Sequence, residues 1–240
     1  LYHDGQFDDS RLLINLAQTA AERGACLLNY APVIGLVKNG DGTVGGLRFR
    51  DEESGSTHSL TARCVINATG PFADELRRQD EPGVEPMISP SQGVHIVLNR
   101  AFLPRETAIM VPHTRDGRVM FAIPWNGHVV VGTTDTPIST LSLEPHPLQG
   151  EIDFILETAR NYLAKPPTRS DILSVFTGIR PLVNANPSAT TSALSRDHSI
   201  VISKSGLLTI GGGKCTTYRK MAEDCVDNAI VLAQLEDREC

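Results

Sequence analysis

A run of glycines followed by a lysine stands near the end of the chain, from Gly211 to Thr216. The letters GGGKCT approach a P-loop, but that motif needs a glycine where Leu208 stands and a serine or threonine at Cys215. What remains is a buried strand, a glycine loop and the start of a helix, whose unpaired N–H groups and positive dipole end favour a negative group. An ordinary tight turn is the alternative, and these residues alone leave both open.

A second glycine pattern, from Gly40 to Gly45, satisfies the G-x-G-x-x-G spacing of a dinucleotide-binding turn. That fingerprint binds pyrophosphate only where it joins a strand to a helix N-terminus. Here the flanking residues predict two strands joined by a hairpin turn at Asp41-Gly42. Since the sequence has no other copy, we expect an intact dinucleotide-binding unit to be absent.

Helices are predicted from their caps and from apolar residues at helical spacing. Asp8, Asp9 and Ser10 can cap a helix whose apolar face runs from Leu12 to Ala21 and which ends at Gly24. Another helix is predicted from Glu151 to Leu163. A third follows the glycine loop and has on one face Met221, Ala222, Cys225, Val226, Ala229, Ile230 and Ala233.

Strands are predicted where apolar or alternating runs lie between turn residues. Prolines are dense from Pro82 onward, which favours an antiparallel sheet with many turns in that part of the chain. We therefore divide the chain into a first part (1–80), a second lobe of antiparallel sheet plus helix (81–170) and a return to the first part (171–240). The predicted strands are residues 25–28, 32–38, 44–50, 64–67, 94–98, 120–123, 128–132, 175–179 and 207–210.

The composition is that of an ordinary globular protein, with 40% hydrophobic and 21% charged residues in 240. A formal net charge of -6 argues against a nucleic-acid binder, which needs a basic face. We find no signal peptide and no apolar stretch long enough to cross a membrane, so we expect a cytoplasmic protein. The five cysteines are scattered without C-x-x-C spacing, so we expect reduced thiols, several of them in the core, and no metal site.

Longer motifs in the chain resemble those of the FAD-dependent glycerol-3-phosphate dehydrogenases. The letters GGGKCTTYRK, from Gly211 to Lys220, resemble the C-terminal flavin loop of that family, GGK-x-TTYR-x-x-A. Two shorter segments also match: Gly178–Leu182 resembles the family's G-[IVL]-R-P-L segment, and Ser195–Asp197 resembles its [ST]-R-[DE] segment. Val65–Pro71 resembles the start of the family's VNATGPW stretch. Pro124–Trp125 together with Val131–Asp135 resembles its PW and GTTD pair.

The resemblance covers nearly the whole chain and implies an α/β (α+β) fold. It implies a partial FAD-binding domain of the D-amino-acid-oxidase-like flavoprotein type at 1–80 and 171–240, plus an antiparallel-sheet substrate lobe at 81–170. The family's N-terminal G-x-G-x-x-G unit, an arginine beyond it and the C-terminal domain have no counterpart here, and Phe72 replaces the usual tryptophan. We therefore expect an internal fragment.

The implied reaction is oxidation of sn-glycerol 3-phosphate to dihydroxyacetone phosphate, with hydride passing to flavin N5 and electrons to quinone. Arg180 and Lys214 are expected to bind the phosphate, with Arg196 next, because guanidinium and ammonium groups suit that dianion. His95 is expected to accept the proton of the alcohol. Structural alternatives remain: an ion pair for Arg180, a surface role for Arg196 and a core histidine at position 95.

The resemblance also implies which residues contact FAD. Lys214, Thr216 and Thr217 are expected beside the flavin edge that becomes negative on reduction, with Gly212 and Gly213 in the same loop. Thr69 and Gly70 are expected at a strand end that the cofactor approaches, or else form a plain strand end. By contrast, residues 133–135 are expected to close a turn. The histidines at positions 3, 58, 113, 128, 146 and 198 are expected to be solvated.

Two other interpretations stay open. One is a glycerol-3-phosphate oxidase, or another oxidase of the same superfamily, that passes electrons to oxygen. The other is an inactive truncated fragment without cofactor, in which a missing layer leaves apolar faces of the Leu12–Ala21 helix and of the Cys64 strand exposed. A homo-dimer and peripheral contact with the inner face of the cell membrane are also expected of the parent protein.

Overall fold

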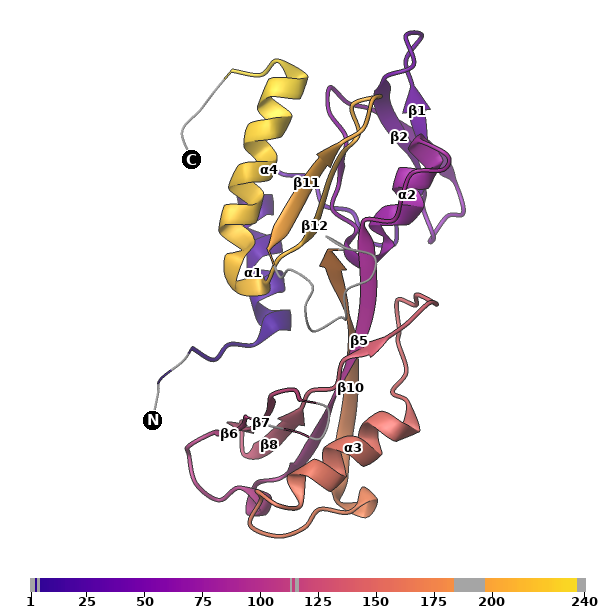
Figure 1. Cartoon of the computed structure of the whole chain (residues 1–240). Coiled ribbons are helices and arrows are strands. Elements are labelled where there is room, and N and C mark those ends of the chain that lie inside the picture. The colour runs from indigo at the N-terminus through magenta and orange to yellow at the C-terminus, as the bar shows by residue number, and fades with distance from the viewer. Residues whose placement is uncertain (1–2, 4, 113, 115–116, 184–196, 237–240) are drawn as a thin grey trace.

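Two long antiparallel strands run through the centre of the molecule and connect its two ends (Figure 1). They are β5 (Ile88–Asn99) and β10 (Ile172–Val183), each of 12 residues. The computed structural model describes residues 3, 5–112, 114, 117–183 and 197–236. Both long strands belong to a 6-stranded sheet of order β10-β5-β8-β7-β6, in which β9 also pairs with β5. The other strands of this sheet are β6 (Ile109–Val111), β7 (Met120–Trp125), β8 (His128–Gly132) and β9 (Thr136–Pro137).

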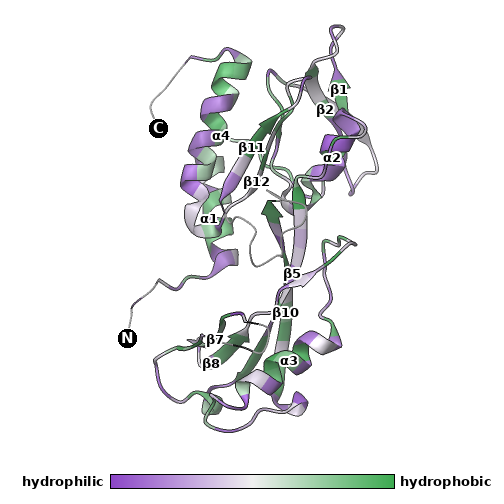
Figure 2. Ribbon diagram, in the orientation of Figure 1, coloured by the Kyte–Doolittle hydropathy of each residue, from purple (hydrophilic) through white to green (hydrophobic). Residues whose placement is uncertain are grey.

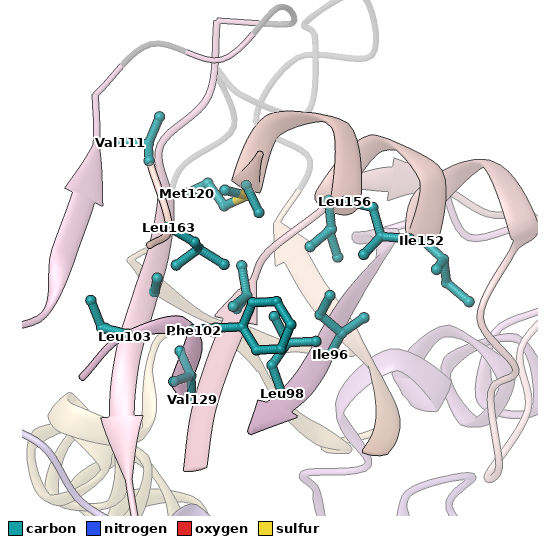
Figure 3. Packing of buried hydrophobic residues seen from close by; sticks show 14 of the residues in the cluster. Ile96, Leu98, Phe102, Leu103, Val111, Met120, Val129, Ile152, Leu156 and Leu163 are labelled. Atoms are coloured by element: carbon teal, nitrogen blue, oxygen red, sulfur yellow. The ribbon is translucent and has the colours of Figure 1, made fainter. Parts of the chain in front are cut away.

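One face of β5 forms the core of the lower lobe. Val94, Ile96 and Leu98 alternate along the strand and are each 0% exposed, as the period of two in a strand requires. They pack under helix α3 (Gln149–Ala159) and against Phe102 (Figure 3). Short 3-10 helices flank this core, η2 (Arg100–Phe102) and η3 (Arg169–Asp171). The residues between Val94, Ile96 and Leu98 along β5 therefore face away from this core.

Two three-stranded sheets form the upper end of the molecule. One has the order β1-β2-β3. The other has the order β11-β12-β4, with β4 parallel to β12. Helices α1 and α4 lie at this end too (Figure 1). The bounds are α1 (Asp9–Glu22), β1 (Val33–Lys38), β2 (Val44–Arg50), β3 (Thr57–Thr61), β4 (Ile66–Asn67), η1 (Gly70–Phe72), α2 (Ala73–Asp80), β11 (His198–Ile202), β12 (Leu208–Gly212), η5 (Cys215–Thr217) and α4 (Tyr218–Ala233).

A buried carboxylate joins α2 to the start of β5. Asp74 accepts hydrogen bonds from the backbone N–H groups of Met87 at 3.0 Å and Ile88 at 2.9 Å, and from Arg77 at 2.6 Å. Burial by itself raises the pKa of Asp74, but these hydrogen bonds and the charge of Arg77 outweigh it and hold the pKa below its ordinary value. The first residues of β5 are therefore fixed by a charged group from another element.

The predicted helices and most predicted strands are confirmed, with shifted ends. The strand predicted at 25–28 is wrong, because those residues are exposed and form no ladder. The strand predicted at 64–67 is reduced to Ile66–Asn67. Sequence patterns missed helix α2 and strands β3, β6, β9 and β11. Strand β3 is exposed throughout and is held by β2, so it carries no alternation of buried side chains from which a strand could be predicted.

Apolar side chains are exposed on the upper end of the molecule. Helix α1 has no buried residue, and its Leu13 is 68% exposed, while Ile66 of β4 is 41% exposed. Figure 2 shows apolar stretches along both α1 and α4. The exposure predicted for the apolar face of the Leu12–Ala21 helix is observed, and in the Cys64 strand Ile66 is exposed while Val65 is buried.

The four cysteines in the described residues differ in their exposure. Cys225 is buried and Cys64 half-buried, but Cys26 and Cys215 are exposed, so fewer thiols lie in the core than predicted. All four are free thiols, and Cys240 lies outside the described residues.

No helix in the described ranges has the length and apolarity to cross a bilayer, and those ranges hold no cluster of three metal-binding side chains.

Candidate active site

A cavity of about 1130 Å³ lies between the upper end of the long strands and helices α1 and α4. Its wall includes His95 of β5, Arg180 of β10 and the glycine loop with Gly212, Gly213 and Lys214. These segments are far apart in the sequence and meet because β10 pairs with β5 and leads back to the upper sheet. The structure thus brings together five of the residues that the sequence singled out.

The β5–β10 ladder sets the position of the histidine. His95 pairs with Phe176, and their rings stack with centroids 4.9 Å apart and planes at 10°. Because side chains alternate between the faces of a strand, His95 points away from the core formed by Val94 and Ile96. The core alternative for His95 is therefore wrong: the ring lines the cavity.

Two glycines make room for the charged and aromatic groups of the cavity. A Cβ atom on Gly93 would lie 2.4 Å from Nη2 of Arg180, and one on Gly132 would lie 2.4 Å from Cδ2 of His95. Carbon atoms do not approach other heavy atoms so closely without displacement. Sequence reasoning missed both glycines, since only the paired strands show what faces them.

The guanidinium of Arg180 is held from the far side by residues 133–135. Its Nη1 donates to the carbonyl oxygen of Thr134 at 3.0 Å, its Nη2 donates to Oγ1 of Thr133 at 2.9 Å, and Nη1 lies 3.7 Å from Asp135. The turn expected at 133–135 has this additional role, which the sequence did not indicate. The ion-pair alternative for Arg180 is thus also present, while the side chain stays 33% exposed and lines the cavity.

His95 is uncharged at neutral pH. Burial lowers the pKa of its imidazole from 6.5 to about 4, and the positive charge of Arg180 adds to this effect. A neutral imidazole has a nitrogen lone pair that can accept a proton, and the lowered pKa makes His95 a weaker base than an ordinary histidine.

The glycine loop follows β12 and has a shape that side chains would not permit. Gly212 and Gly213 have φ angles of 77° and 78°. A Cβ atom on Gly213 would lie 2.3 Å from the sulfur of Met221, and one on Gly212 would lie 2.6 Å from the carbonyl oxygen of Asp197. The loop presents Lys214 and then Cys215 to the cavity before α4 begins.

Other predicted site residues lie away from this cavity wall. Thr217 accepts from the Lys214 N–H at 3.2 Å and so caps the loop, and Thr216 does not line the cavity. Thr69 donates to Asn67 at 2.7 Å, and it and Gly70 also lie outside the cavity wall, where Ala68 stands instead. Arg196 lies outside the described residues.

The remaining histidines are mostly exposed, as expected. His3, His58, His128 and His146 are exposed, and His113 lies outside the described residues. His198 differs, because it is half-buried and its Nε2 lies 2.9 Å from Asp224 of α4. That contact forms only when β11 pairs with β12 near α4, which the sequence did not reveal.

The chain is similar to a known protein family and to proteins of known name. A family model described as "FAD dependent oxidoreductase" matches residues 1–219. The protein named "Glycerol-3-phosphate dehydrogenase SDP6, mitochondrial" from Arabidopsis thaliana is 46% identical over 238 residues. That match covers 98% of this chain and 38% of the relative, so the chain spans well under half the length of this relative.

Solved structures of flavoproteins are also similar to this chain. The glycerol-3-phosphate dehydrogenase from Bacillus halodurans, solved with FAD, has a TM-score of 0.86 and 34% identity, covering 97% of this chain and 45% of that chain. The L-alpha-glycerophosphate oxidase from Mycoplasma pneumoniae, with FAD bound, has a TM-score of 0.67 and 19% identity, covering 92% and 54%. At that identity the second structure indicates a shared fold alone. The predicted α/β (α+β) flavoprotein fold is confirmed.

Proposed function

Because the chain belongs to the family of FAD dependent oxidoreductases, we propose that it carries the substrate cleft of an enzyme that oxidises glycerol 3-phosphate to dihydroxyacetone phosphate. One observation carries the proposal: Arg180, Lys214 and an uncharged His95 line the same cavity. Two cations suit a phosphate dianion, and a neutral imidazole suits the removal of a hydroxyl proton. The similarity to proteins named glycerol-3-phosphate dehydrogenase supports the same substrate.

The glycine loop fits the cofactor that the family implies. Its two glycines line the cavity with backbone alone, and Lys214 beside them is a cation for a negative ring edge. Gly212, Gly213 and Lys214 would hold that part of FAD, with Thr216, Thr217, Thr69 and Gly70 proposed as further contacts. Bound FAD would supply the acceptor for the hydride that leaves the alcohol carbon.

The roles of the substrate-binding residues follow from their chemistry. Arg180 offers N–H groups in a planar fork that matches two phosphate oxygens, and Lys214 offers a point charge from the glycine loop. Arg196 is proposed as a further phosphate ligand. His95 takes the hydroxyl proton, and the stacked ring of Phe176 limits the directions in which the imidazole can turn.

We propose quinone as the onward electron acceptor. The name dehydrogenase belongs to a relative with 46% identity, whereas the glycerophosphate oxidase shares 19%. The oxidase alternative makes a different prediction, since its reduced flavin would reoxidise rapidly in air. Peripheral membrane contact, a homo-dimer and the division at residues 80 and 170 into flavin-binding and substrate-binding parts stay predictions.

The proposal is tested by incubating the purified chain with excess FAD, desalting it and recording its absorption spectrum. We expect retained flavin absorbance that bleaches when glycerol 3-phosphate is added without air and does not bleach with glycerol. Arg180→Met should abolish bleaching by the phosphate ester. The matched control is Arg169→Met, because Arg169 pairs with Asp153 at the surface of the lower lobe.

The outcomes separate the alternatives. Bleaching followed by reoxidation with a soluble quinone, but slowly with oxygen, supports the dehydrogenase. Rapid reoxidation in air supports the oxidase. A chain that folds but retains no flavin and binds no glycerol 3-phosphate contradicts the proposal for this chain and supports the inactive fragment.

A further inference from the structure

A buried carboxylate outside the cavity wall has its hydrogen-bonding capacity filled. Glu151 of α3 is 5% exposed. Its Oε1 accepts from the hydroxyls of Thr134 at 3.0 Å and Thr136 at 2.7 Å. Its Oε2 accepts from Nε2 of Gln92 at 2.8 Å and the backbone N–H of Leu148 at 2.9 Å. Burial by itself raises the pKa of Glu151, but these four donors outweigh it and hold the pKa below its ordinary value, so the group is charged.

One of the four donors leads directly to the cavity. Oγ1 of Thr134 accepts from the backbone N–H of Val94 at 3.0 Å and donates its own proton to Glu151. The orientation of the Thr134 hydroxyl is therefore fixed by these two hydrogen bonds. The carbonyl oxygen of the same residue accepts from Nη1 of Arg180. Thr134 therefore joins the carboxylate of Glu151 to the guanidinium of Arg180 within one residue.

Thr136, a second donor to Glu151, has no such link to Arg180. Thr136 lies in the short strand β9, which pairs with β5 at Ser91 and Gln92. Its hydroxyl shares Oε1 of Glu151 with Thr134 but has no hydrogen bond to the residues that hold Arg180. The two threonines thus make the same kind of bond to the same oxygen atom, and only one of them contacts Arg180.

We propose that Glu151 is a positioning residue for substrate phosphate: through Thr134 it fixes where the Arg180 guanidinium lies in the cavity. The inference rests on the proposed function, in which Arg180 binds the phosphate. Glu151 itself does not line the cavity. Its contribution is to the binding of the phosphate ester and not to the proton transfer at His95.

A glutamine at position 151 cannot replace the carboxylate. An amide has one acceptor oxygen and one NH₂ donor, whereas all four partners of Glu151 donate to it. If the NH₂ faced Oγ1 of Thr134, that hydroxyl would have to accept from it as well as from Val94. The link to Arg180 is therefore expected to loosen in Glu151→Gln.

The test compares Thr134→Val, Thr134→Ser and Thr136→Val in the full chain, beside Glu151→Gln. Thr134→Ser keeps the hydroxyl and should behave like the unchanged chain, and Thr136→Val removes a bond to Oε1 without contacting Arg180. Arginine side-chain N–H resonances, assigned with Arg180→Lys, report how well the guanidinium is held. Glycerol 3-phosphate affinity is measured by calorimetry.

We expect Thr134→Val and Glu151→Gln to broaden the Arg180 resonances and to weaken glycerol 3-phosphate binding by about tenfold, the loss of roughly one charge-assisted hydrogen bond. Thr136→Val and Thr134→Ser should stay within about twofold. In the active enzyme, Thr134→Val and Glu151→Gln should raise KM for glycerol 3-phosphate and leave kcat nearly unchanged.

Equal effects of Thr134→Val and Thr136→Val on both readouts would overturn the inference and make Glu151 a packing residue of the lower lobe. If the unchanged chain bound no glycerol 3-phosphate but the Arg180 resonances responded as expected, the proposed function would fail while the positioning of Arg180 by Glu151 would stand. If Glu151→Gln failed to fold, the serine and valine variants at position 134 would still decide the question.

Discussion

Gly93 of β5 pairs with Gly178 of β10, and the Arg180 guanidinium, two residues further along β10, lies over Gly93. The first prediction follows from this arrangement. Gly93→Ala should displace the guanidinium, because the new Cβ would lie 2.4 Å from Nη2 of Arg180. Since only the end of a flexible side chain must move, we expect a stability change within about 1 kcal/mol but a loss of glycerol 3-phosphate affinity of at least about tenfold. Calorimetry and thermal unfolding measure the two effects.

The cross-strand partner provides a matched control for that substitution. A Cβ atom on Gly178 would meet nothing within 4 Å. Gly178→Ala should therefore leave the Arg180 guanidinium in place, while its own methyl group is added to the cavity wall. The control readout is the Arg180 side-chain N–H resonances, which should shift in Gly93→Ala and stay unchanged in Gly178→Ala. Equal shifts in both variants would mean that alanine disturbs the β5–β10 ladder itself and does not act through Arg180.

The second prediction concerns Gly132 of β8, which lies beside His95. Gly132→Ala places a Cβ atom 2.4 Å from the His95 ring and 2.9 Å from the carbonyl oxygen of Val94. Because backbone as well as side chain must shift, we expect a loss of about 1–3 kcal/mol in stability together with a changed His95 environment. Denaturant unfolding and the chemical shift of the His95 ring measure these effects. An unchanged shift would contradict the close packing of these two residues.

The third prediction is a pH dependence that arises from His95. Its pKa is about 4 in the folded chain and near 6.5 when unfolded, so between these values only the unfolded chain binds the proton. The free energy of unfolding should therefore fall as pH drops from 6.5 to 4, by at most about 1.4 kcal/mol per pH unit. Denaturant unfolding across this range should show a smaller slope in His95→Gln, with His146→Gln at an exposed site as the control.

The titration of the His95 ring separates the two causes of its low pKa. Arg180→Met removes the positive charge but leaves the burial, which is the larger cause. NMR titration should show the pKa of His95 above about 4 but still below 6.5 in this variant. A value unchanged by the substitution would show that Arg180 and His95 do not interact.

The fourth prediction concerns Asp74, which joins α2 to β5. Asp74→Asn replaces an acceptor of Met87 and Ile88 N–H groups by an amide and removes the partner of Arg77. We expect a loss of about 2–4 kcal/mol in stability, measured by chemical denaturation. Glu75→Gln, one residue along the helix and exposed, should change it by less than about 0.5 kcal/mol. Similar losses would contradict the role assigned to Asp74.

The sequence predicted the elements that carry their own periodic pattern, such as α1, α4 and the strands on either side of Asp41-Gly42. It also singled out His95, Arg180 and Lys214, because their residue types and motifs are distinctive. It missed the part of the site that depends on pairing: Gly93, Gly132 and Thr134 matter only because of what faces them across strands. No local pattern of residues encodes such long-range contacts.

The division of β5 into two faces limits how this part of the chain can vary in length. Along the strand, Val94 and Ile96 serve the core while Gly93 and His95 serve the cavity. Deletion of a single residue in this stretch would reverse the assignment beyond it, turning valine and isoleucine toward the cleft and the imidazole toward the apolar core. Insertions and deletions should therefore be confined to the surface turns, and β5 should keep its length wherever the cleft is used.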